Sequence, residues 1–125
     1  MIEDLIERLF HARNAAHIAH WKTKSYAEHK ALGHYYEDVI AQLDNLIEAY
    51  QGTFGIIGSV DEQEKDISKI IHDDIIWLNE NRNKVAKGVS ALENIVDELT
   101  ATHMKTALSY YHGSSRACQH KFGGW

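Results

Sequence analysis

Apolar side chains recur every three or four residues along most of the chain, which is the spacing of one face of an α-helix. The stripe runs over residues 2–22, resumes over 26–51, and reappears over 60–86 and 89–112. The pattern therefore predicts four helices. The third begins near Val60 or, if its polar start frays, near Asp66.

Capping sequences mark the expected helix starts. In a capping box a serine caps the helix, and a glutamate three residues later reaches back to the serine. Three such pairs occur, Ser25–Glu28, Ser59–Glu62 and Ser90–Glu93, unless the last helix starts slightly before its pair. The chain has no proline to interrupt a long helix, and Gly52 is the expected end of the second one.

Four amphipathic helices, with one longer connection between the second and the third, predict an all-α fold: an antiparallel four-helix bundle over residues 1–112. A dimer of two-helix hairpins is the structural alternative. Residues 113–125 are expected to form a polar tail. Within it, Cys118 and His120 supply only two ligands, too few for a metal site, and Trp125 is typical of an interaction element.

Composition excludes several classes of protein. The 125 residues are 44% apolar and 25% charged, which is typical of one globular domain. The apolar runs are too short to span a membrane, and the acidic start is unlike a signal peptide. A single cysteine favours a reducing compartment, so we expect a cytoplasmic protein. A net charge of -5 disfavours nucleic-acid binding.

Three of the nine histidines, His20, His29 and His103, fall on predicted core faces. A helix turns by about 100° per residue, so His20 points the same way as Ile2, five turns earlier. On the second helix His29 shares the direction of Ile47, in the middle of the apolar arc. His17 falls at the edge of the first core face.

Carboxylates line the border of the same apolar arc. Relative to His29, the acids Asp44, Glu37 and Glu48 are rotated by about 60°, 80° and 100°. Imidazoles and carboxylates together suit iron and other divalent metals. The plainer interpretation is a hydrogen-bonded core histidine beside the start of a solvated face. His103 in the last helix faces the core without a supporting acid stripe, so the plainer interpretation is preferred there.

Spacing within these residues resembles a known signature. His20-Trp21, His29, then Asp44 fifteen residues later and Glu48 four residues after that resemble the ferroxidase signature of the miniferritins, the Dps family. The glycine-rich exit after Glu48 is also similar. The resemblance covers roughly residues 10–58 and implies a ferritin-like bundle.

The resemblance also implies a site and an activity. His20 and His29 would bind metal from one subunit, and Asp44 and Glu48 from its partner across a two-fold axis. Iron, as a di-iron pair, is the implied metal, with manganese or zinc as alternatives, and peroxide or oxygen is the implied oxidant. The implied protein is a homo-oligomer that stores and detoxifies iron; it is at least a dimer, and a shell of twelve subunits and larger assemblies stay open.

One position departs from the miniferritin pattern. Where those proteins carry an aspartate four residues after the helix-2 histidine, this chain has Gly33, and Glu37 one turn later is the candidate substitute. This departure supports a second hypothesis, a catalytically inactive ferritin-like protein with a structural or interaction role. DNA binding is disfavoured, because the tail carries few basic residues, chiefly Arg116 and Lys121.

Overall fold

The chain is all-α. We describe it from a computed structural model, which covers residues 1–60 and 66–115, with side chains of the last helix described through Ser109. No strand occurs over these ranges. The four helices are α1 (Ile2–Lys22), α2 (Tyr26–Phe54), α3 (Ile67–Ala86) and α4 (Ser90–Ser115). The predicted all-α class and the predicted number of helices are confirmed over the described residues.

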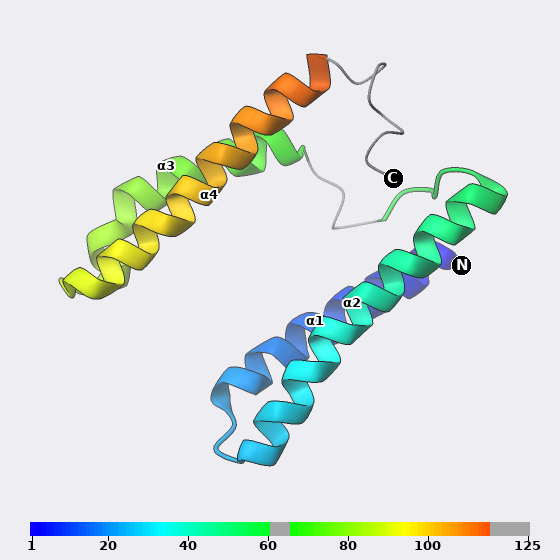
Figure 1. Cartoon of the computed structure of the whole chain (residues 1–125), viewed down its shortest axis with the longest axis horizontal. Coiled ribbons are helices and arrows are strands. Elements are labelled where there is room, and N and C mark those ends of the chain that lie inside the picture. The colour runs from blue at the N-terminus through cyan, green and yellow to red at the C-terminus, as the bar shows by residue number, and fades with distance from the viewer. Residues whose placement is uncertain (61–65, 116–125) are drawn as a thin grey trace. The chain divides into compact units, whose positions relative to one another are not determined.

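The helices pair in sequence order. Helix α1 packs along α2, and α3 packs along α4, so that each pair forms a helical hairpin (Figure 1). The chain divides accordingly into two compact units, Met1–Glu64 and Lys65–Trp125.

The start of α2 shows half of the predicted capping box. The Ser25 hydroxyl accepts a hydrogen bond from the Glu28 backbone N–H at 3.3 Å, as expected for an N-cap. The return bond from Glu28 is not made, because the Ser25 N–H donates to the Thr23 hydroxyl at 3.2 Å instead. At the other end, α2 continues through Gly52 to Phe54 and stops at Gly55, whose φ of 99° takes it out of the helix.

The second hairpin agrees with the prediction at the start of α3 and differs from it at the end of α4. Of the two predicted starts of the third helix, the structure has the later one: α3 begins at Ile67, with the Asp66 carboxylate accepting from the Lys69 backbone N–H at 3.3 Å. A carboxylate at that position satisfies a free helical N–H, which fixes the start. The Ser59–Glu62 pair lies partly outside the described residues. Helix α4 runs on to Ser115, three residues into the predicted tail, and the tail's Cys118, His120 and Trp125 are outside the described range.

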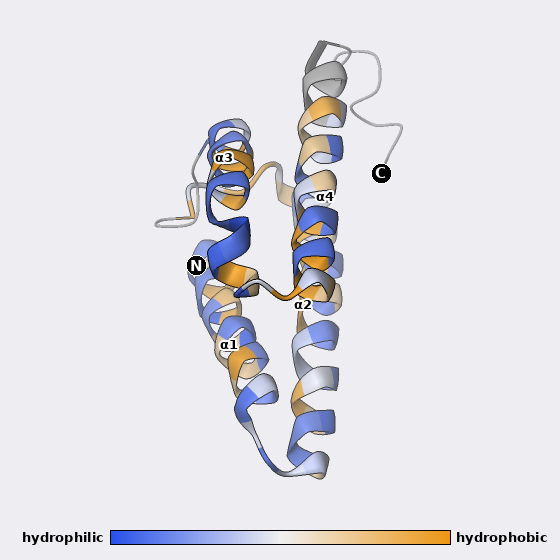
Figure 2. Cartoon of the chain, turned by 90° about the vertical axis from the view of Figure 1, so that its left-hand side faces the viewer, coloured by the Kyte–Doolittle hydropathy of each residue, from blue (hydrophilic) through white to orange (hydrophobic). Residues whose placement is uncertain are grey.

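Few side chains are fully buried within either hairpin. The buried apolar residues are Ile6, Ala16, Val39 and Leu43 in the first and Ala86 and Val96 in the second. Apolar residues otherwise form stripes along helices whose remaining surface is hydrophilic (Figure 2). Much of the helical periodicity read from the sequence therefore lies on surfaces that a single hairpin leaves exposed.

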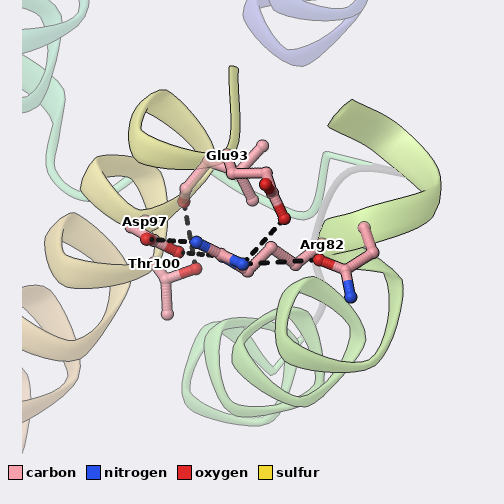
Figure 3. Close-up of polar contacts among 6 residues, drawn as sticks. Arg82, Glu93, Asp97 and Thr100 are labelled. Atoms are coloured by element: carbon pink, nitrogen blue, oxygen red, sulfur yellow. Dashed lines mark hydrogen bonds and ion pairs between the residues drawn. The ribbon is translucent and has the colours of Figure 1, made fainter. Parts of the chain in front are cut away.

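A polar cluster joins α3 to α4. The Arg82 guanidinium donates to both Asp97 carboxylate oxygens, at 2.6 and 2.9 Å, and to the Glu93 carboxylate at 2.9 Å (Figure 3). The two-pronged contact with Asp97 matches the fork of the guanidinium. It raises the pKa of Arg82 and lowers that of Asp97, with the hydrogen bond as the first cause in each case. Glu93, which was predicted to complete a capping box with Ser90, accepts a hydrogen bond from Arg82 in this cluster.

Candidate functional site

Two predicted site residues meet where α1 passes into α2. The His20 ring stacks on the His29 ring, with centroids 3.6 Å apart and planes 18° from parallel. His20 Nδ1 lies 2.6 Å from the His29 carbonyl oxygen, and His29 Nδ1 lies 2.7 Å from the His20 carbonyl oxygen. We call this reciprocal arrangement the histidine clasp.

The clasp has a local structural cause. The last carbonyl groups of a helix lack partners within it, and His20 lies in the last turn of α1. The His29 imidazole, in the first turns of α2, reaches back to one of these carbonyls. The three-residue connection, Thr23–Ser25, is short enough to hold the two helix ends together.

Hydrogen bonding fixes the proton positions of both rings. A carbonyl oxygen only accepts, so each Nδ1 must carry the proton and donate. A neutral imidazole then has its lone pair on Nε2. Over the described part of the chain, neither Nε2 takes part in a hydrogen bond or ion pair with protein. Metal-binding histidines are usually prepared in this way, with the far ring nitrogen donating to a carbonyl or carboxylate.

An aromatic cluster continues from the clasp along α1 and α2. The His17 ring stacks on Tyr36 at 4.0 Å between centroids and lies 4.4 Å from the Trp21 ring. Tyr36 meets the His20 ring edge-on at 5.3 Å. The Arg13 guanidinium lies 5.6 Å from the centre of the Tyr36 ring, within reach of a cation–π contact.

These neighbours change the protonation of His17. Its pKa lies below the ordinary 6.5, first because the ring is partly removed from water and then because Arg13 and His20 disfavour a further positive charge. His17 is therefore biased toward the neutral form at pH 7. A neutral ring next to His20 keeps positive charge away from the clasp.

The predicted carboxylates do not join the clasp within one chain. Glu37 lines an open groove between α1 and α2, beside Arg13 and Tyr36. Asp44 lines a second, more apolar groove further along the hairpin, and Glu48 is exposed. Among the residues that the structure describes, no three histidine, cysteine, aspartate or glutamate side chains gather closely enough to hold a metal ion.

The burial of the histidines partly follows the prediction. His20 is half-buried against α2, but His29, placed by periodicity in the middle of the apolar arc, is exposed. The His29 ring contacts the ring and the carbonyl oxygen of His20 on α1, and the rest of the side chain is open to solvent. His103 is half-buried and donates from Nδ1 to the Leu99 carbonyl at 2.8 Å, as the plainer interpretation expects, and its Nε2 lies 3.8 Å from the Asp74 carboxylate of α3.

Two partners of the site were not singled out by sequence reasoning. Neither Tyr36 nor Arg13 is among the predicted site residues. A usable signal existed, because Tyr36 follows His29 by seven residues, about two turns, and so lies on the same face of α2. Arg13 precedes His17 by one turn on α1.

Fold and site together define an all-α protein of two helical hairpins, the first of which carries a histidine clasp. The chain belongs to the family DUF5856, a family of unknown function whose model matches residues 20–110. That range begins at His20 and covers all of α2 and α3. No curated protein and no solved structure matches the chain. No helix within the described residues is long and apolar enough to cross a membrane.

Proposed function

We propose that this protein is a ferritin-like iron-binding protein that oxidises Fe(II) with peroxide or oxygen, for iron storage and detoxification. The histidine clasp supplies two of its metal ligands, the Nε2 atoms of His20 and His29. The observation that carries the proposal is the pair of Nδ1 hydrogen bonds to carbonyl oxygens, because they leave both Nε2 lone pairs free to bind metal.

The remaining ligands come from a second copy of the chain in this proposal. Asp44 lies fifteen residues after His29 in the same helix, which corresponds to about 22 Å at a rise of about 1.5 Å per residue. One α2 helix cannot bring its own Asp44 to its own His29. Asp44 and Glu48 are exposed and so are available to a neighbouring chain. This division agrees with the resemblance to the miniferritins.

The donor set suits Fe(II). Neutral imidazoles and ionised carboxylates bind iron, manganese or zinc at pH 7 without first losing a tightly held proton. Two Fe(II) ions, as substrate, supply the two electrons that reduce one peroxide to two waters, with uptake of two protons. The clasp holds the imidazoles in orientation, and carboxylates stabilise the more highly charged ferric product.

The ferritin-like four-helix bundle is the fold that we propose for the working protein. The α3–α4 hairpin leaves large apolar side chains exposed beside its helix contact: Ile67, Ile70, Trp77, Leu92, Ile95 and Leu99. Viewed from the N- to the C-terminus of each helix, these exposed residues are rotated by about 90°, in the same direction, from the residues that contact the other helix. Because α3 and α4 are antiparallel, both sets then lie on the same side of the pair. The α1–α2 hairpin has an apolar groove of its own, lined by Ile6, Phe10, Leu43, Ile47, Ile56 and Ile57.

Anaerobic titration of the full chain with Fe(II), followed by addition of peroxide, tests the proposal. The decisive variants are His20→Asn and His29→Asn. The Asn amide nitrogen is as many bonds from Cα as His Nδ1, so it preserves a donor for the carbonyl while removing Nε2. His34→Asn, at an exposed position on α2, is the matched control.

We expect saturable Fe(II) binding and rapid oxidation by the natural chain and by His34→Asn. Each clasp variant should bind Fe(II) at least tenfold more weakly while keeping its helical circular dichroism. Asp44→Asn should lower affinity as well. Absence of Fe(II) binding by the folded natural chain, or unchanged binding by His29→Asn, would overturn the proposal.

The second candidate is a scaffold or interaction protein without metal chemistry. It is favoured by the absence, within the described residues, of a three-ligand cluster in one chain, and by the fact that the clasp already joins two helix ends. In that case His29→Asn, which keeps the donor, behaves like the natural chain in every assay. His29→Ala then lowers only the melting temperature.

A further inference from the structure

Gly33 lies close to the Cε1 and Nδ1 atoms of the His20 ring. It follows His29 by one turn of α2, so that its Cα faces α1 at the level of the clasp. A Cβ atom built on Gly33 would lie 3.1 Å from His20 Cε1 and 3.4 Å from His20 Nδ1. A carbon–carbon contact at optimal separation is about 3.5–4.0 Å, so a side chain here would press on the ring.

The His20 ring has little freedom to move away. It is stacked on His29 at 3.6 Å between centroids, and its Nδ1 is hydrogen-bonded to the His29 carbonyl at 2.6 Å. Displacement by a few tenths of an ångström would lengthen that hydrogen bond or separate the stacked rings. The contact therefore acts on the clasp itself, not on the end of a flexible side chain.

Another glycine in the same helix lacks such a neighbour. A Cβ built on Gly52 would have no atom within 4 Å apart from its own helix backbone and its chain neighbours. Glycine is a poor helix former compared with alanine, so replacement at an open helical position should stabilise α2. The two glycines differ in what faces them, and this difference supplies a matched control.

We propose that Gly33 is a positioning residue for His20. The missing side chain lets the imidazole lie against α2 and donate from Nδ1 to the His29 carbonyl, which leaves the lone pair on Nε2. The effect on metal binding rests on the proposed function, whereas the positioning of the ring does not. Gly33 is the position at which this chain departs from the miniferritin pattern. Its role in this proposal is to leave room for the His20 ring and not to bind metal.

The first test reads the His20 ring directly, by ¹⁵N NMR of the imidazole nitrogens in the full chain without metal. We expect the natural chain and Gly52→Ala to show His20 protonated at Nδ1. Gly33→Ala should move His20 toward the Nε2-protonated form, which is the more common state of a free imidazole. Fe(II) affinity of Gly33→Ala should fall about tenfold. An unchanged His20 tautomer in folded Gly33→Ala would overturn the inference.

A double-mutant cycle keeps the test decisive if Gly33→Ala folds poorly. The smaller side chain of His20→Asn relieves the contact with an added Cβ. Gly33→Ala should therefore lower the melting temperature in the natural background and raise it, as Gly52→Ala does, in the His20→Asn background. Equal effects in both backgrounds would refute the positioning role. If the natural chain binds no Fe(II), the proposed function fails, but the cycle still decides the role of Gly33.

Discussion

The two hairpins are joined by different chemistry. In α1–α2, aromatic and imidazole rings add to the apolar core, with the histidine clasp at one end and His17 and Tyr36 beside it. In α3–α4 a single guanidinium, that of Arg82, links two acids of α4. The first hairpin has five basic and eleven acidic residues, a net -6, and the second has eight and seven, a net +1. The Nε2 atoms of His20 and His29, which take part in no hydrogen bond or ion pair with the described residues, lie in the acidic first hairpin, where a cation would be attracted.

The two hairpins also differ in the side chains that they leave available for chemistry. The Arg82 guanidinium is already paired with the Asp97 and Glu93 carboxylates, so these charged groups hold α3 and α4 together. The first hairpin keeps two imidazole nitrogens available. We infer that α3–α4 contributes chiefly packing surface and that α1–α2 contributes the site.

The largest expected effect tests that packing role. Leu99→Asp places a charge on the exposed apolar side of α4, where Leu99 is 50% exposed in the hairpin. If this side is covered in the bundle, the variant loses about 3 kcal/mol or more, since a buried charge without a partner is costly. Thermal unfolding measures the loss. Met104→Asp, 57% exposed and rotated away from that side, should change stability by less than about 0.5 kcal/mol. Equal, small effects of both would show that the side stays in water.

A somewhat smaller loss is expected in the core of the first hairpin. Leu43 is 4% exposed, so Leu43→Ala should reduce the free energy of unfolding by about 2–5 kcal/mol. Leu46→Ala on the same helix, where the side chain is 43% exposed, is the control and should cost much less. Urea unfolding gives both values. Similar losses for both leucines would indicate that the outer side of α2 is also covered.

The polar cluster of the second hairpin should give the next effect. Arg82→Met keeps much of the side chain's length but leaves the half-buried Glu93 without its guanidinium partner. We expect a lower melting temperature, with no change in Fe(II) binding. Lys69→Met, which breaks an exposed pair with Asp73, should leave the melting temperature nearly unchanged. A matching drop for Lys69→Met would argue that general charge balance, not the α3–α4 cluster, is responsible.

The smallest expected effect is a pH dependence in the first hairpin. Because the pKa of His17 is lowered in the folded chain, the unfolded chain binds more protons between that lowered value and 6.5. The contribution of His17 to stability is therefore present above pH 6.5 and is lost as the pH falls through the lowered pKa. Melting curves from pH 7.5 to 5 should show this loss, reduced in His17→Phe. A profile unchanged by His17→Phe would assign the pH dependence to other groups.

The sequence by itself determined the helices. Apolar periodicity and the absence of proline gave four helices, and Ser25 identified the start of α2, because these signals act over a few residues. The helix ends were predicted less accurately, because several local groups compete to form them. Gly52 was expected to end α2, yet the helix continues to Phe54, and Asp66 rather than Ser59 caps α3. Helix ends depend on which nearby group satisfies a free N–H or C=O, and several candidates compete within one turn.

Only the tertiary structure decided the state of the candidate ligands. Periodicity brought His20 and His29 to facing surfaces, and the resemblance gave them a role as metal ligands. Neither the periodicity nor the resemblance could show that each ring donates from Nδ1 to the other residue's carbonyl, or that Gly33 makes room for the His20 ring. Those contacts depend on the relative position of two helices to within a few tenths of an ångström. A pattern that repeats every 3.6 residues specifies a direction, whereas hydrogen bonds and close contacts require a distance.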